Sequence, residues 1–158
     1  RILERCQLPP QCLNIEITES ALIEKNSSCI RVLNDVKAMG VQLTLDDFGT
    51  GYASLAYLTR LPIDYLKIDK SFVMAMNSDK TSRTIVMSVL AMAGTLSIEV
   101  VAEGIENEGT LTQLREARCQ YGQGFLVARP LPTGEIEALM KTRQRRETRA
   151  AELLSSQD

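Results

Sequence analysis

The stretch LTLDDFGTGYASL, residues 43–55, decides how this chain is organised. It opens with the alternating apolar residues of a β-strand, reaches the adjacent acids Asp46 and Asp47, and then turns through Gly49 and Gly51. No Gly-Lys-Ser/Thr follows the glycines, so the loop is not a phosphate-binding P-loop. Two neighbouring carboxylates repel each other, and a hard divalent cation would hold them together. An Asp-Asp pair before a helix is also a common N-cap, so the pair alone does not decide between the two readings.

Strand and helix patterns alternate on both sides of this stretch. We predict strands over residues 13–17, 41–45, 65–68, 100–102 and 121–125. We predict helices over residues 29–39, 52–58, 85–93, 107–117 and 133–140. This alternation indicates an α/β fold in which about five parallel strands carry helices on their outer face.

Four charged side chains share one face of the predicted sheet. Side chains alternate along a strand, so the apolar residues of each strand oppose one charged residue at or near its C-terminal end. These residues are Glu16, Asp46, Lys67 and Glu103. In a (β/α) barrel this inward face builds the active site, so we expect the four groups to converge. The alternative is an antiparallel or half-exposed sheet whose polar face is merely hydrated.

Composition removes several classes of chemistry. The 158 residues include no histidine, which excludes Ser-His and Cys-His catalysis and any zinc site with a histidine ligand. The net charge of −2 gives no general attraction to nucleic acid, and we expect no nucleic-acid partner. The four cysteines form no Cys-x-x-Cys pair, so we expect free thiols and a cytoplasmic location. No stretch is apolar for long enough to predict a membrane segment.

Five sequence blocks resemble the EAL domain family. In chain order they are EITES at 16–20, DDFGTGYASL at 46–55, LPIDYLKIDKSFV at 61–73, VVAEGIE at 100–106 and YGQGF at 121–125. Active members of that family are bacterial phosphodiesterases that open cyclic di-GMP to linear pGpG. The resemblance implies a modified TIM barrel, of which this chain would form a part, and it implies cyclic di-GMP as the ligand.

The resemblance also implies roles for individual residues. Glu16, Asp46 and Asp47 match the family's metal ligands, for Mg²⁺ or Mn²⁺ in a two-metal site. Lys67 and Glu103 match its catalytic residues: the lysine contacts the attacking water, and the glutamate is a general base or a further acid at the metals. Three supporting positions of the family match Glu19, Glu106 and Gln123. The family residue at the position of Glu19 steadies the loop that carries the aspartates.

One part of the family pattern is absent. The Glu-Ala-Leu strand that names the family lies upstream of the EITES block, together with an asparagine ligand and an arginine that contacts phosphate. The Glu-Ala-Leu at 137–139 falls on the last predicted helix, and we interpret it as coincidence. We therefore expect residues 1–140 to be the C-terminal part of an EAL-type domain, inactive alone, and residues 141–158 to be a basic, polar helical extension or tail.

The origin and activity of the chain stay open at this point. It is either a portion of a longer protein or a natural truncated relative whose open barrel is covered by a second copy or another subunit. It is either part of a cyclic di-GMP phosphodiesterase or a non-catalytic module that binds the nucleotide or a protein partner. A fragment of another metal-dependent barrel enzyme is the third reading.

Overall fold

The computed structural model describes residues 2–23, 28–51 and 58–142. It divides into two compact units, Arg1–Val127 and Ala128–Asp158. The second unit contains a helix over residues 133–142, where the sequence predicts the last helix. The predicted boundary between a domain and a tail at residue 140 remains a prediction.

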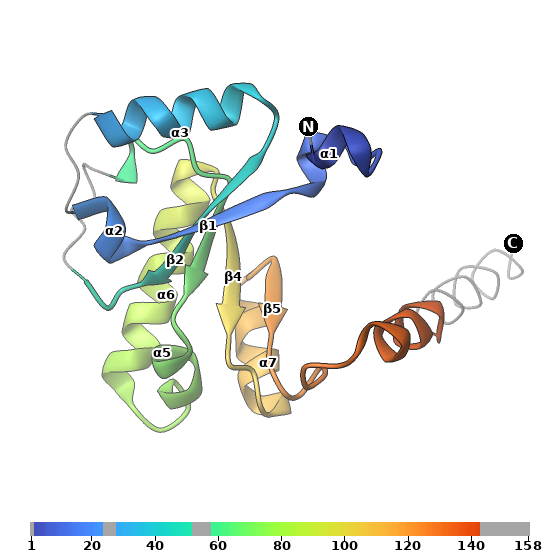
Figure 1. The fold of residues 1–158 in the computed structure, drawn as a ribbon. Coiled ribbons are helices and arrows are strands. Elements are labelled where there is room, and N and C mark those ends of the chain that lie inside the picture. The colour runs from blue at the N-terminus through green and yellow to red at the C-terminus, as the bar shows by residue number, and fades with distance from the viewer. Residues whose placement is uncertain (1, 24–27, 52–57, 143–158) are drawn as a thin grey trace, which may run out of the picture. The chain divides into compact units, whose positions relative to one another are not determined.

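The first unit is built on one sheet of five parallel strands (Figure 1). The strands are β1 Asn14–Thr18, β2 Gln42–Phe48, β3 Tyr65–Ile68, β4 Glu99–Glu103 and β5 Tyr121–Gln123. Their order in the sheet is their order in the chain, and every neighbouring pair is parallel. Connections of this kind place their helices on the sheet's outer face, as in one sector of a (β/α) barrel. The predicted number and direction of the strands are confirmed.

The longer helices follow their strands as the periodicity predicts. They are α3 Ser28–Ala38, α6 Lys80–Leu96 and α7 Glu108–Glu116. Four short elements among the described residues were not predicted: α1 Ile2–Arg5, the 3₁₀ helix η1 Pro10–Cys12, α2 Glu19–Ile23 and α5 Lys70–Ala75. Each has six residues or fewer, too few for a helical period to stand out. Residues 52–57 of the helix predicted over 52–58 lie outside the described residues.

The core confirms the alternation of the central strands. Leu43 and Leu45 on β2, Leu66 and Ile68 on β3, and Ala102 on β4 are completely buried under the outer helices. The first strand departs from this pattern, because Leu13 and Ile15 are 39% and 37% exposed. Among the described strands β1 pairs only with β2, and α3 packs against β2, which leaves the predicted apolar face of β1 open.

Two strand ends differ from the sequence prediction by more than one residue. Strand β2 continues to Phe48, because its pairing with β3 resumes there after an irregular register between Leu45 and Phe48. Strand β5 ends at Gln123 instead of continuing to Phe125, since the backbone at Gly124 passes directly over Ile105. In the described part of the chain, no helix is both long and apolar enough to cross a membrane.

Candidate active site

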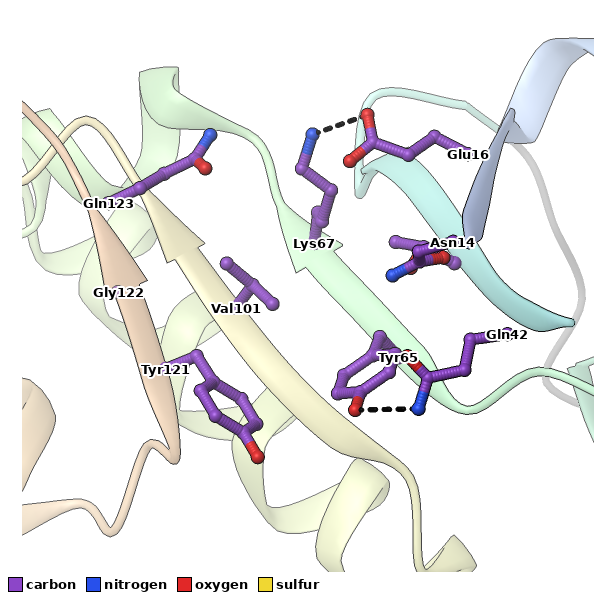
Figure 2. A pocket seen from close by; sticks show the side chains of 10 residues that line it. Asn14, Glu16, Gln42, Tyr65, Lys67, Val101, Tyr121, Gly122 and Gln123 are labelled. Carbon is purple, nitrogen blue, oxygen red and sulfur yellow. Dashed lines mark hydrogen bonds and ion pairs between the residues drawn. The ribbon is translucent and has the colours of Figure 1, made fainter. Parts of the chain in front are cut away.

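Lys67 lies at the centre of three carboxylates on the inner face of the sheet. Its Nζ is 2.9 Å from Glu16 Oε2, 3.0 Å from Asp46 Oδ1 and 2.7 Å from Glu103 Oε1. The four side chains come from β1, β2, β3 and β4, and Figure 2 shows Lys67 reaching Glu16 across the neighbouring strand. The convergence predicted from strand alternation is confirmed, and the reading of a merely hydrated face is wrong.

The lysine at the centre of the cluster is buried, and its single positive charge is shared by three carboxylates. The Lys67 side chain is only 10% exposed, and those of Asp46 and Glu103 are 19% and 15% exposed. Burial alone lowers the pKa of Lys67, but its hydrogen bonds to Glu103, Glu16 and Asp46 outweigh burial and raise this pKa well above its ordinary value. The lysine is therefore a fixed cation at neutral pH.

The two adjacent aspartates point to different surroundings. Asp47 has a left-handed backbone with φ of 56°, so the chain departs locally from the extended conformation near the end of β2. Its N–H donates to Asp46 Oδ1 at 3.0 Å, and its side chain is exposed, whereas the Asp46 carboxylate turns inward to Lys67. Among the described residues no group of three acids is close enough to hold a metal ion. The predicted ligands Glu16, Asp46 and Asp47 thus have suitable oxygen donors, but in the described residues they are not arranged as a complete metal-binding site.

Glu19 holds the turn that follows the aspartates. The residue is 2% exposed, and its Oε2 accepts hydrogen bonds from the backbone N–H groups of Gly49 and Gly51, each at 3.2 Å. A side chain at Gly51 would meet the Glu19 carboxyl carbon at 2.7 Å, so the carboxylate fits only against a glycine here. This geometry supports the stabilising role that the family resemblance implies for Glu19.

The two remaining predicted residues lie in different positions. Gln123 Nε2 donates to Glu103 Oε1 at 2.7 Å, which orients the carboxylate that also faces Lys67. Glu106 is exposed in the segment after β4, and within the described part of the chain it makes no hydrogen bond or ion pair with the cluster. The structure thus brings Gln123 into the site and leaves Glu106 outside it.

A groove beside Lys67 was not predicted from the sequence. A groove of about 400 Å³ extends from Lys67 towards the N-terminal ends of the strands (Figure 2). The rings of Tyr65 and Tyr121 meet edge to face in it, with centroids 5.7 Å apart, and Gln42 donates to the Tyr65 hydroxyl. Strand alternation already places Tyr65 and Gln42 on the charged face, and that signal could have identified them.

Comparison with known proteins assigns this arrangement to a family. The model of the EAL domain matches residues 1–130. The chain belongs to the EAL domain family. The EAL chain is 43% identical over 139 residues to cyclic di-GMP phosphodiesterase NbdA of Pseudomonas aeruginosa, covering 88% of this chain and 18% of NbdA.

Solved EAL structures have the same fold as this chain. The PaMucR phosphodiesterase in complex with c-di-GMP has a TM-score of 0.82 and 40% identity, over 85% of this chain and 54% of that one. Klebsiella pneumoniae BlrP1, in a manganese and cyclic di-GMP complex, has a TM-score of 0.75 and 36% identity, over 81% of this chain and 33% of BlrP1. These neighbours confirm the EAL-type barrel fold, and this chain spans only part of each.

Proposed function

We propose that this chain supplies part of a metal-dependent site that hydrolyses cyclic di-GMP to linear pGpG. The observation that carries the proposal is the buried contact of Lys67 with Glu16, Asp46 and Glu103. A purely structural sheet gains little from a buried lysine surrounded by carboxylates, because the cost of desolvating these charges offsets most of their attraction. Membership of the EAL family and the cyclic di-GMP complexes of PaMucR and BlrP1 support the choice of substrate.

Glu16, Asp46 and Asp47 are the residues that would hold divalent cations. Their donor atoms are all oxygens, which Mg²⁺ and Mn²⁺ prefer, and the manganese complex of BlrP1 supports this assignment. Bound cations would activate a water and stabilise the leaving oxygen of the phosphodiester. Because three acids do not yet form a cage in the described residues, further oxygen ligands are needed to complete the coordination.

The chain's own residues have distinct tasks in this proposal. Lys67, held protonated by its three carboxylates, places a fixed positive charge where a phosphate oxygen or the attacking water would lie. Glu103, oriented by Gln123, is the group that would accept the proton of that water. Glu19 keeps the turn after the aspartates in place by binding two backbone amides.

A non-catalytic function is the second candidate. The lack of a three-acid metal group among the described residues favours a module that binds cyclic di-GMP, or a protein partner, without cleaving it. The β1 edge, with Leu13 and Ile15 exposed, would suit contact with a second copy or another subunit. The four free cysteines, two of them exposed, agree with a cytoplasmic location in either case.

The metal assignment predicts a large effect of removing both aspartate charges. We expect the Asp46→Asn/Asp47→Asn variant to bind Mn²⁺ at least about tenfold more weakly than the unaltered chain, since neutral amides are poorer ligands for a hard cation. Titration of Mn²⁺ followed by electron paramagnetic resonance of the free ion measures this affinity. Asp35→Asn, which removes an exposed acid from α3, is the matched control and should leave the affinity unchanged. Equal affinities in all three proteins would disprove the metal assignment.

Incubation with substrate separates the two candidate functions. We expect the 158-residue chain alone to produce no measurable pGpG from cyclic di-GMP and Mn²⁺, because an incompletely coordinated cation is misplaced and a shift of about 1 Å can cost about a hundredfold in rate. Chromatography detects the product, and calorimetry detects nucleotide binding without cleavage. Turnover that Glu103→Gln abolishes would show that the chain is an enzyme by itself.

A further inference from the structure

The short helix α5 approaches two glycine turns that flank the site. Gly49 follows the aspartates on β2 with φ of +100°, and Gly104 follows Glu103 on β4 with φ of +74°. A methyl group at Gly49 would lie 3.0 Å from Cε2 of Phe72, and one at Gly104 would lie 2.8 Å from Cβ of Lys70. Phe72 and Lys70 both belong to α5, so one helix contacts the turns behind both groups of acids.

The helix is itself anchored to the strand that carries the lysine. Asp69 directly follows β3, and its carboxylate caps α5 by accepting a hydrogen bond from the Ser71 N–H at 2.9 Å. Val73 of α5 is completely buried in the core, and the Phe72 ring packs against that core from the side of the turn. The position of α5 relative to Lys67 is therefore determined by a connection of one residue and by core packing.

The turn at Gly49 is held on two sides. Glu19 accepts hydrogen bonds from the N–H groups of Gly49 and Gly51, and the Phe72 ring lies where a methyl group on Gly49 would come within 3.0 Å of it. Hydrogen bonds alone fix the direction of the amides, whereas a rigid ring in van der Waals contact limits how far the turn can move towards α5. The exposed Asp47, two residues before Gly49, depends on this turn for its position.

We propose that Phe72 is a positioning residue: through Gly49 it fixes the turn that directly follows Asp46 and Asp47, and α5 thereby sets the separation between that turn and Glu103. The inference rests on the proposed function of these acids, but the contact itself can be tested without metal or substrate. Neither the family resemblance nor the Lys67 cluster assigns a role to this ring.

The test compares two truncations on the same helix. Phe72→Ala removes the ring that faces Gly49, whereas Val73→Ala removes core volume without touching the turn. We expect Phe72→Ala to accelerate hydrogen exchange of the Gly49 and Gly51 amides by about tenfold or more, with less than about threefold acceleration in Val73→Ala, because only the first opens the turn locally. Nuclear magnetic resonance of the full 158-residue chain measures both amides. Phe72→Leu keeps an apolar branched side chain, so its acceleration of amide exchange should lie between those of Phe72→Ala and Val73→Ala.

Manganese affinity provides the second readout. We expect Phe72→Ala to weaken Mn²⁺ binding by about fivefold or more, and Val73→Ala to leave it within about twofold, because ligand positions are sensitive to small displacements. If the unaltered chain binds no Mn²⁺, the proposed metal site fails, while amide exchange still decides the role of Phe72. Equal acceleration of exchange in Phe72→Ala and Val73→Ala would overturn the inference. If circular dichroism shows that Phe72→Ala is unfolded, the same comparison between Phe72→Leu and Val73→Ala decides it.

Discussion

Replacing Lys67 by methionine is expected to lower the free energy of unfolding by about 3 kcal/mol or more, as when one partner of a buried ion pair is removed. Methionine fills a similar volume but leaves Asp46 and Glu103, both less than a fifth exposed, facing each other without a cation. Urea unfolding at pH 7, followed by circular dichroism, measures the difference. A loss below about 1 kcal/mol would mean that the cluster is solvated and does not hold the strands together.

The matched control is the same substitution at a more exposed lysine. Lys37 pairs with Asp64 at 2.5 Å, but the two side chains are 36% and 28% exposed. We expect Lys37→Met to cost less than about 1 kcal/mol, since water screens a pair that is about a third exposed and solvates the carboxylate left behind. Comparing the two substitutions distinguishes the cost of leaving buried carboxylates without a cation from the cost of losing the lysine's packing contacts.

The pH dependence of the Lys67 contribution follows from the direction of its pKa shift. The folded-state pKa lies above the ordinary value of 10.5, so the stabilisation is complete below that value and is lost only as the pH rises through the raised pKa. Between pH 7 and pH 10 the difference between Lys67→Met and the unaltered chain should therefore stay constant.

Gly124→Ala is expected to be the most damaging single methyl addition. Its methyl group would lie 2.2 Å from the carbonyl oxygen and 2.3 Å from the nitrogen of Ile105, which are backbone atoms and cannot rotate away. The segment after β4 would have to move, breaking the hydrogen bonds from Leu126 N to Ile105 O and from Ile105 N to Gln123 O. We expect a loss of about 3 kcal/mol or more in the free energy of unfolding, from overpacking and two lost hydrogen bonds.

Adding a methyl group at a second glycine provides a control that should have the opposite effect on stability. Gly94 lies in α6, and apart from its chain neighbours and the nearby backbone of its own helix no atom is within 4 Å of the place where its methyl group would be. Gly94→Ala should raise the free energy of unfolding by about 0.5–1 kcal/mol, because alanine loses less conformational entropy in a helix. Thermal unfolding of both variants, followed by circular dichroism, shows whether each substitution lowers or raises the stability of the fold. A mild effect of Gly124→Ala would show that Ile105 and β5 are free to separate.

Most of what could be predicted about the site came from the alternation of side chains along the strands. The two-residue period placed Glu16, Asp46, Lys67 and Glu103 on one face, and parallel pairing brought them to the same end of the sheet. Such local patterns do not contain the pairing register. The sequence therefore could not show which carboxylates the lysine would contact, or that Gln123 would reach Glu103 while Glu106 stays in solvent.

The sequence by itself determined the parallel α/β architecture, its charged inner face and the family, because hydrophobic periodicity and motif spacing are properties of neighbouring residues. Only the tertiary structure decided how the two aspartates are arranged, with Asp46 against Lys67 and Asp47 exposed, because local residue patterns contain neither the left-handed backbone at Asp47 nor the irregular register near the end of β2. It also decided that α5 lies against Gly49 and Gly104. These contacts join residues from three separate strand ends, and their geometry depends on how the whole sheet and its helices pack.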